Sequence, residues 1–221
     1  MEEKRLFDIL KLYIAKYPNQ EIALAKKESG NWRKFSIQEY VEITNNISYA
    51  LIELGIKKDD KVGIVCNNRP EWNMLDMAIM QVGAITVPIY PTISKEDYNY
   101  IINDCGVKLV VLEGQAVLQK IESVKANTPS LTAIYTIGTK SEHPSFEQLV
   151  EIGKNNPNPE ELKNREDSVD EKDCATIIYT SGTTGNPKGV MLSHYNIMSQ
   201  IHNLKQTPST WSKKAFSFLP I

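Results

Sequence analysis

The sequence is poor in cysteine and contains no pair with the spacing Cys-x-x-Cys. Its three cysteines, Cys66, Cys105 and Cys174, lie far apart along the chain. Zinc sites and disulfide frameworks need cysteines at close and regular spacing, so this distribution indicates neither. Each cysteine flanks an apolar run, and we therefore expect three buried free thiols.

Long apolar runs and a strong excess of one charge are also missing. No apolar run approaches the roughly 18 residues that a membrane-spanning helix needs, and residues 1–5 do not lead into a secretory signal. The 25 Lys and Arg residues nearly balance the 27 Asp and Glu residues, for a net charge of −2, which argues against sequence-independent binding of nucleic acid. With 221 residues, 41% of them hydrophobic and 24% charged, we expect a soluble, globular, cytoplasmic protein of one large or two small domains.

Strands and helices alternate at short range over residues 1–138. Ser36 with Glu39 has the pattern of a capping box at a helix start. The same pattern recurs at Ser94 and Asp97. Helical spacing is found over residues 6–17, 36–54, 70–82, 94–104 and 115–126, and strand character over residues 21–25, 32–35, 61–66, 84–90, 107–112 and 131–137. This alternation predicts an α/β fold with a parallel, doubly wound sheet and flanking helices.

The pattern weakens after this region and predicts a division of the chain into three parts. Residues 1–138 are predicted to form an α/β subdomain. Residues 139–173 are predicted to be an acidic connector, in which helical spacing is limited to residues 146–152. Residues 174–221 are predicted to begin a further subdomain that carries a ligand-binding loop.

The second half of the predicted connector is strongly charged. Residues 157–173 contain seven acidic and three basic residues and almost no apolar ones. Such a composition is typical of an exposed connecting segment. A helix over residues 160–165 with a solvated face is the alternative.

The most informative segment is a loop over residues 179–189 that is rich in glycine, hydroxyl residues and lysine. A buried strand over residues 174–179 leads into it, and Ser193 begins a helix shortly after it. Glycine lets backbone N–H groups point inward, and hydroxyl groups together with Lys188 suit an anionic phosphate. The loop lacks the Walker spacing, because Pro187 precedes Lys188, and it lacks the Gly-x-Gly-x-x-Gly pattern. It therefore predicts a different nucleotide-binding loop, with a flexible surface loop as the alternative.

The string Thr-Ser-Gly-Thr-Thr-Gly-Asn-Pro-Lys-Gly over residues 180–189 resembles the signature of the adenylate-forming superfamily. That superfamily contains acyl-CoA synthetases, luciferases and the adenylation domains of peptide synthetases. Two upstream strings, at residues 67–72 and 81–92, look most like the long-chain fatty acyl-CoA synthetase branch, above all at Ile-Tyr-Pro-Thr. The resemblance extends over about residues 7–221.

Residues 67–72 also have a purely structural interpretation. They follow a predicted strand and open a predicted helix, at the end of a sheet where ligands collect. Equally, Asn68 would cap the helix, Pro70 would be its first residue, and Trp72 would pack inward.

The resemblance implies a ligase that works in two steps and uses ATP, Mg²⁺ and coenzyme A. A fatty acid carboxylate attacks the α-phosphate of ATP to give an acyl-adenylate, and the thiol of coenzyme A then displaces AMP. The residues implied in binding the β- and γ-phosphates are Thr180, Ser181, Gly182, Thr183, Thr184, Gly185 and Lys188. A solvated Lys188 on the loop rim is the alternative. No catalytic or metal-binding residue is expected within this chain, and His194 is interpreted as part of a helix start.

Residues 215–221 look like a buried strand at the very end of the sequence. We therefore expect the chain to be the front part of a longer protein and to be inactive alone. Two alternatives to a fatty acyl-CoA ligase stay open: a fatty acyl-AMP ligase and a non-catalytic nucleotide-binding module. The missing Walker spacing counts against a third, a P-loop kinase or ATPase. Peripheral membrane contact is compatible with a long-chain substrate, although no basic amphipathic helix is present. No oligomeric state is predicted.

Overall fold

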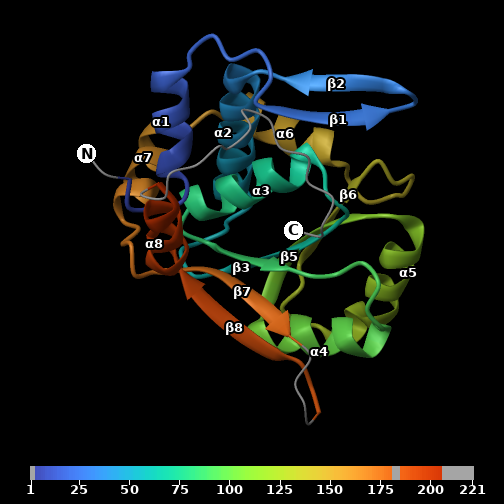
Figure 1. Ribbon diagram of the computed structural model, residues 1–221. Helices are drawn as coiled ribbons and strands as arrows, with labels where there is room; N and C mark the ends of the chain where they lie inside the picture. The colour runs from blue at the N-terminus through green and yellow to red at the C-terminus, as the bar shows by residue number, and fades with distance from the viewer. Residues whose placement is uncertain (1–2, 181–184, 206–221) are drawn as a thin grey trace.

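The computed structural model describes residues 3–180 and 185–205, and a six-stranded sheet forms their centre (Figure 1). The strands lie in the order β6-β5-β3-β4-β7-β8. Their bounds are β3 Lys61–Val65, β4 Ile85–Pro88, β5 Val107–Glu113, β6 Ala133–Ile137, β7 Cys174–Thr180 and β8 Lys188–Ser193. All neighbouring pairs are parallel except β7 and β8, which form an antiparallel hairpin. The predicted parallel, doubly wound α/β sheet is confirmed, with one antiparallel strand at its edge.

Helices cover both faces of this sheet (Figure 1), and two apolar cores lie between them and the strands. In β5, Leu109 and Val111 pack into one core. Val110 and Leu112 pack into the other. Because successive side chains of a strand point to opposite faces, a continuous apolar run is what a sheet buried on both sides needs. The helices over one core are α2 Ile37–Glu53, α3 Pro70–Gln81 and α6 Phe146–Asn155, and those over the other are α4 Lys95–Cys105 and α5 Gln115–Val124.

Capping boxes begin three of the described helices. The two predicted boxes are present at the starts of α2 and α4. In the first, Ser36 Oγ accepts a hydrogen bond from the Glu39 N–H at 3.1 Å, and the Glu39 carboxylate accepts one from the Ser36 N–H at 2.8 Å. A third box, which the sequence analysis did not identify, begins α6 at Ser145 and Gln148. These caps satisfy backbone donors that no helical partner can reach.

Residues 157–173 contain a nine-residue helix, and most of the segment is exposed. Helix α7 (Pro159–Asp167) occupies the first part, and Leu162 and Glu166 are buried against the rest of the protein. The alternative of a helix over residues 160–165 is the correct one. One apolar side chain, Leu162, is enough to hold this short helix against the protein. The charged residues around it conceal the helix in the sequence. The division of the whole chain into three parts stays a prediction.

The remaining elements lie around these layers. Helix α1 (Asp8–Lys16) agrees with the predicted first helix, and α8 (His194–Lys205) follows β8. The first predicted strand begins later than expected, and β1 (Leu24–Glu28) pairs with β2 (Asn31–Phe35) in a separate antiparallel hairpin. A 3-10 turn, η1 (Lys125–Asn127), extends α5. The described helices all fall short of the length and apolar character that a bilayer crossing requires.

The three cysteines are free, as predicted, but each is only partly buried. The expectation of buried thiols is therefore met only in part. Cys66 follows β3, and burial raises the pKa of its thiol to about 12, which keeps it protonated and unreactive at neutral pH. The strand predicted over residues 215–221 lies outside the described residues.

Candidate functional site

The predicted phosphate loop connects β7 to β8 at one end of the sheet (Figure 1). β7 runs parallel to β4, so the loop leaves the sheet at the carboxyl end of a parallel strand. In α/β proteins ligands bind outside this end of the strands. The two residues at the base of the loop, Thr180 and Lys188, therefore lie at an end of the sheet where ligands commonly bind.

The structure describes three of the residues predicted to bind phosphate. Thr180 and Lys188 are opposite each other in the last pair of the hairpin, and both are exposed. Gly185 has a φ of 122°, in the region that favours glycine. The other predicted residues lie outside the described part of the chain: Ser181, Gly182, Thr183 and Thr184. Phosphate binding by all seven residues stays a prediction.

One contact at the start of the loop was not identified from the sequence. The hydroxyl of Tyr179, the first residue of the loop, donates a hydrogen bond to Asp104 Oδ2 on α4 at 2.6 Å. The two residues are 75 positions apart, so no local pattern could have found the contact. Gly189 lies directly opposite Tyr179 in the hairpin.

Residues 5–8, which we call the N-terminal clasp, tie the start of the chain to the segment after α7. The Arg5 guanidinium binds both carboxylate oxygens of Asp8, with Nε–Oδ2 at 3.1 Å and Nη2–Oδ1 at 2.8 Å. Its Nη1 also donates to the backbone carbonyls of Val169, at 3.3 Å, and Glu166. One side chain thus joins the first helix to the segment that leads into β7.

His194 connects the same clasp to the end of β8. Its side chain is 2% exposed, and Nδ1 accepts a hydrogen bond from the Leu6 N–H at 3.3 Å. Burial and the positive charge of Arg5 lower the pKa of His194 to about 4, so the ring is neutral at physiological pH. The predicted helix start is confirmed, because Ser193 Oγ accepts a hydrogen bond from the Asn196 N–H at 3.2 Å.

The structural interpretation of residues 67–72 is correct in part. Pro70 is the first residue of α3, and Trp72 packs against the core, as predicted. The N-cap, however, is Arg69, which makes no side-chain capping bond. The assignment of Asn68 as the cap is therefore wrong, because Pro70 is the first helical residue and the N-cap is the residue directly before it, Arg69.

Arg69 instead organises a cluster of charges where β3 and β5 end. Its Nη1 lies 2.6 Å from Glu113 Oε1, and its Nε lies 3.0 Å from Glu71 Oε2. Lys26 also forms an ion pair with Glu71. Burial alone raises the pKa of Glu71, but hydrogen bonds from Arg69 and Lys26 bring that pKa below its ordinary value. Since each charge has an opposite partner, this cluster is explained by folding rather than by a ligand.

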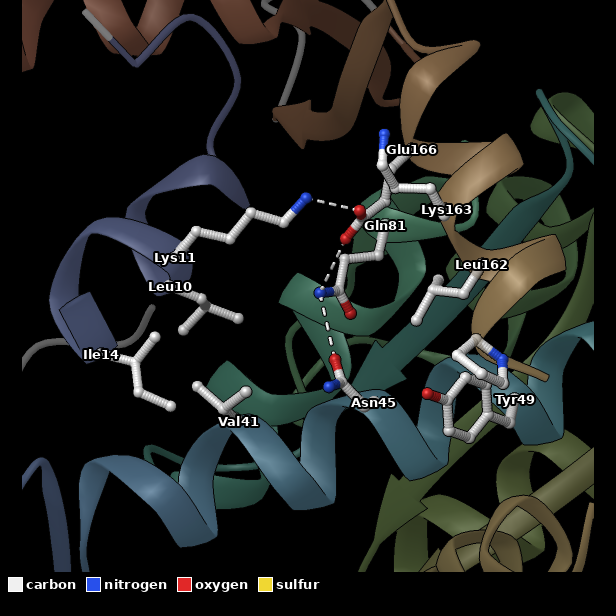
Figure 2. Close-up of a pocket in the computed structure, with 11 residues that line it drawn as sticks. Leu10, Lys11, Ile14, Val41, Asn45, Tyr49, Gln81, Leu162, Lys163 and Glu166 are labelled. Carbon is white, nitrogen blue, oxygen red and sulfur yellow. Dashed lines mark hydrogen bonds and ion pairs between the residues drawn. The ribbon is translucent and has the colours of Figure 1, made fainter. Parts of the chain in front are cut away.

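A cavity of about 250 Å³ lies between α1, α2, α3 and α7, and Figure 2 shows the side chains that line it. At its polar end Gln81 Nε2 donates to Glu166 Oε1 at 3.3 Å and to Asn45 Oδ1 at 3.4 Å. Lys11 Nζ lies 2.5 Å from Glu166 Oε2. Leu162 and other apolar side chains form the walls. These polar groups satisfy one another, so the cavity is a packing feature of four helices and not part of the candidate site.

A family comparison now identifies the class of the protein. The model of the family described as AMP-binding enzyme matches residues 11–221. This match covers nearly the whole chain, and the chain belongs to the AMP-binding enzyme family. The predicted membership of the adenylate-forming superfamily is confirmed.

Two relatives show which branch of the family the chain is similar to. A long-chain-fatty-acid–CoA ligase of Xenopus laevis is 38% identical over 181 residues, which are 80% of this chain and 24% of that protein. Fatty acyl-CoA synthetase A of Dictyostelium discoideum is 32% identical over 197 residues, which are 84% of this chain and 28% of that protein. The predicted resemblance to long-chain fatty acyl-CoA synthetases is confirmed. The chain spans about a quarter of the length of these relatives.

Solved structures agree with this assignment. A long-chain-fatty-acid-CoA ligase from Archaeoglobus fulgidus is 25% identical with a TM-score of 0.73, over 92% of this chain and 40% of that one. An anthranilate CoA ligase in complex with anthranoyl-AMP is 25% identical with a TM-score of 0.71, over 86% of this chain and 35% of that one. The α/β fold described above is thus the fold of adenylate-forming ligases.

Proposed function

We propose that this chain is part of an ATP-dependent long-chain fatty acid–CoA ligase and contributes its phosphate-binding loop. The observation that supports this most directly is the placement of Thr180 and Lys188. They face each other at the base of a glycine-rich loop, at the carboxyl end of a parallel strand. The similarity to long-chain-fatty-acid–CoA ligases supports the choice of substrate.

The chemistry of the loop suits a triphosphate. Residues 179–189 contain four hydroxyl residues besides Tyr179, one lysine and no acidic residue, so the loop offers donors and a positive charge to phosphate oxygens. Mg²⁺ prefers carboxylate and water oxygens. Within residues 3–180 and 185–205 no group of three or more His, Cys, Asp or Glu is arranged to hold a metal ion. We therefore assign Mg²⁺ to no residue of the described part of the chain.

In the proposed reaction a fatty acid carboxylate oxygen attacks the α-phosphorus of ATP, and pyrophosphate leaves with the bonding electrons. Negative charge grows on the leaving phosphates, and the loop donors with Lys188 stabilise it there. The sulfur of coenzyme A then attacks the acyl carbon, its proton goes to solvent, and AMP leaves. The role of this chain is to bind and orient the leaving pyrophosphate.

The first prediction concerns Lys188. In the full protein, Lys188→Met is expected to lower the rate of acid-dependent ATP–pyrophosphate exchange by about 10- to 100-fold, because a charge-assisted contact to the leaving group contributes roughly 1.5–3 kcal/mol. The measurement uses radioactive pyrophosphate and a series of saturated acids from short to long chain. Exchange that requires a long-chain acid identifies the substrate class.

Lys140→Met is the matched control, because Lys140 is exposed on a loop away from the hairpin. It should exchange like the wild type. Acyl-CoA formation after addition of coenzyme A then separates the ligase from an acyl-AMP ligase that only adenylates. Folded full protein that exchanges with no acid would instead support a non-catalytic nucleotide-binding module.

A further inference from the structure

Tyr179, the residue before Thr180 near the end of β7, is hydrogen-bonded to helix α4 on one face of the sheet. The Tyr179 hydroxyl donates to Asp104 Oδ2 at 2.6 Å, a length typical of a hydrogen bond to an ionised carboxylate. Burial and this carboxylate both raise the pKa of Tyr179, so the hydroxyl stays a donor throughout the physiological range. The bond fixes the end of β7 relative to α4 (Figure 1).

The same ring also holds the other strand of the hairpin. Tyr179 pairs directly with Gly189, and a Cβ at Gly189 would lie 3.1 Å from Tyr179 Cζ and 2.9 Å from Ile177 Cγ2. The tyrosine ring therefore occupies the space that a side chain at Gly189 would need. An aromatic ring over a cross-strand glycine stabilises an edge strand that otherwise lacks a side-chain contact. Through one residue, α4, β7 and β8 are held in a common position.

Asp104 is an unusual residue for its place in α4. It lies in the last turn of α4, and this turn contains no basic residue. A carboxylate near the negative end of a helix is unfavourable. The hydrogen bond from Tyr179 offsets this cost, which gives Asp104 a role outside its own helix.

We propose that Asp104 and Tyr179 are positioning residues for the phosphate loop. Their hydrogen bond sets where β7 ends, and the ring over Gly189 sets where β8 begins. These two contacts therefore determine where the neighbouring strand pair, Thr180 and Lys188, lies. This inference rests on the proposed function and adds to it two residues that touch no nucleotide.

The test measures ATP–pyrophosphate exchange in the full protein for Tyr179→Phe, Asp104→Asn and the double variant. Each single substitution is expected to raise the KM for ATP by about three- to tenfold, with little change in the KM for the acid. The double variant should resemble either single one, because both remove the same bond. Tyr100→Phe is the matched control. It removes a hydroxyl of the same helix that interacts electrostatically with Asp104 but does not join α4 to β7, and it should leave the KM for ATP unchanged.

A second measurement needs no nucleotide. Trypsin cleaves after lysine, so the rate of cleavage at Lys188 under native conditions reports how often the hairpin end opens. We expect cleavage to be about three- to tenfold faster in Tyr179→Phe and Asp104→Asn, and unchanged in Tyr100→Phe. The wild type could show no exchange activity while Tyr179→Phe and Asp104→Asn are still cleaved faster. That result would refute the proposed ligase function and support the positioning role.

Three results would overturn the positioning role. One is an active wild type in which Tyr179→Phe leaves both the KM for ATP and the cleavage rate unchanged. Another is additive effects of Tyr179→Phe and Asp104→Asn. The third is a parallel rise in the KM for both substrates with a lower melting temperature, which would mean a general loss of stability.

Discussion

Gly153→Ala is expected to lower the free energy of unfolding by more than about 3 kcal/mol, because alanine has no room at this position. Helix α6 packs on α2 at Gly153, where an added Cβ would lie 1.7 Å from the backbone oxygen of Asn46 and 2.9 Å from the backbone nitrogen of Ala50. Both neighbours are backbone atoms of a helix and cannot rotate away. The two helices would have to separate, which would open the core between them and the sheet.

This expectation has the opposite sign to helix propensity. Within an exposed helix, replacing glycine by alanine stabilises by roughly 0.5–1 kcal/mol. Urea unfolding followed by circular dichroism would measure the difference, with Lys154→Ala on the exposed face of α6 as the control. Lys154→Ala should remain within about 0.5 kcal/mol of the wild type. A Gly153→Ala protein as stable as the wild type would show that α6 can move on α2 without loss.

The second large effect is a pH dependence that originates at His194. The folded pKa of about 4 lies below the unfolded value of about 6.5. Above pH 6.5 the imidazole is neutral in both states, and its contribution to stability is fully present. Between pH 6.5 and 4 the unfolded chain binds a proton that the folded protein does not, so stability falls as the pH falls. The loss attributable to this residue reaches about 3 kcal/mol near pH 4.

His194→Gln isolates this contribution, since glutamine keeps an acceptor for the Leu6 N–H but does not titrate. The free energy of unfolding would be measured at several values between pH 7 and 4 for the variant and the wild type. Carboxylates remote from residue 194 titrate alike in both proteins, so the difference between the two curves should grow steadily in favour of the variant below pH 6.5. Parallel curves for His194→Gln and wild type would contradict the assignment.

Much of the architecture could be predicted from local patterns. Apolar runs such as Val107–Glu113 and the capping box at Ser36 have short periods, so a window of a few residues contains the whole signal. The errors arose where one residue outweighed the composition around it. Leu162 docks α7 in a segment that is otherwise charged, and Pro70 as the first residue of α3 places the N-cap at Arg69 and not at Asn68.

The candidate site divides in the same way. The glycine, hydroxyl and lysine residues of the loop are contiguous, and their chemistry is visible without a structure. The contact of Tyr179 with Asp104 spans 75 residues, and that of Leu6 with His194 spans 188. Neither has a periodic signal, because each depends on how the sheet brings distant segments together. Only the fold could reveal what supports the loop.

The N-terminal clasp has a consequence for how the chain is made. Phe7 is fully buried and its ring meets that of His194 edge-on, with centroids 5.7 Å apart. Ribosomes add about 5–20 residues per second, so the first segment waits roughly 10–40 seconds before His194 is synthesised. During that time its apolar side chains lack their final partner and are open to chaperones. Residues 5–8 therefore leave the ribosome well before the partner that completes their native environment.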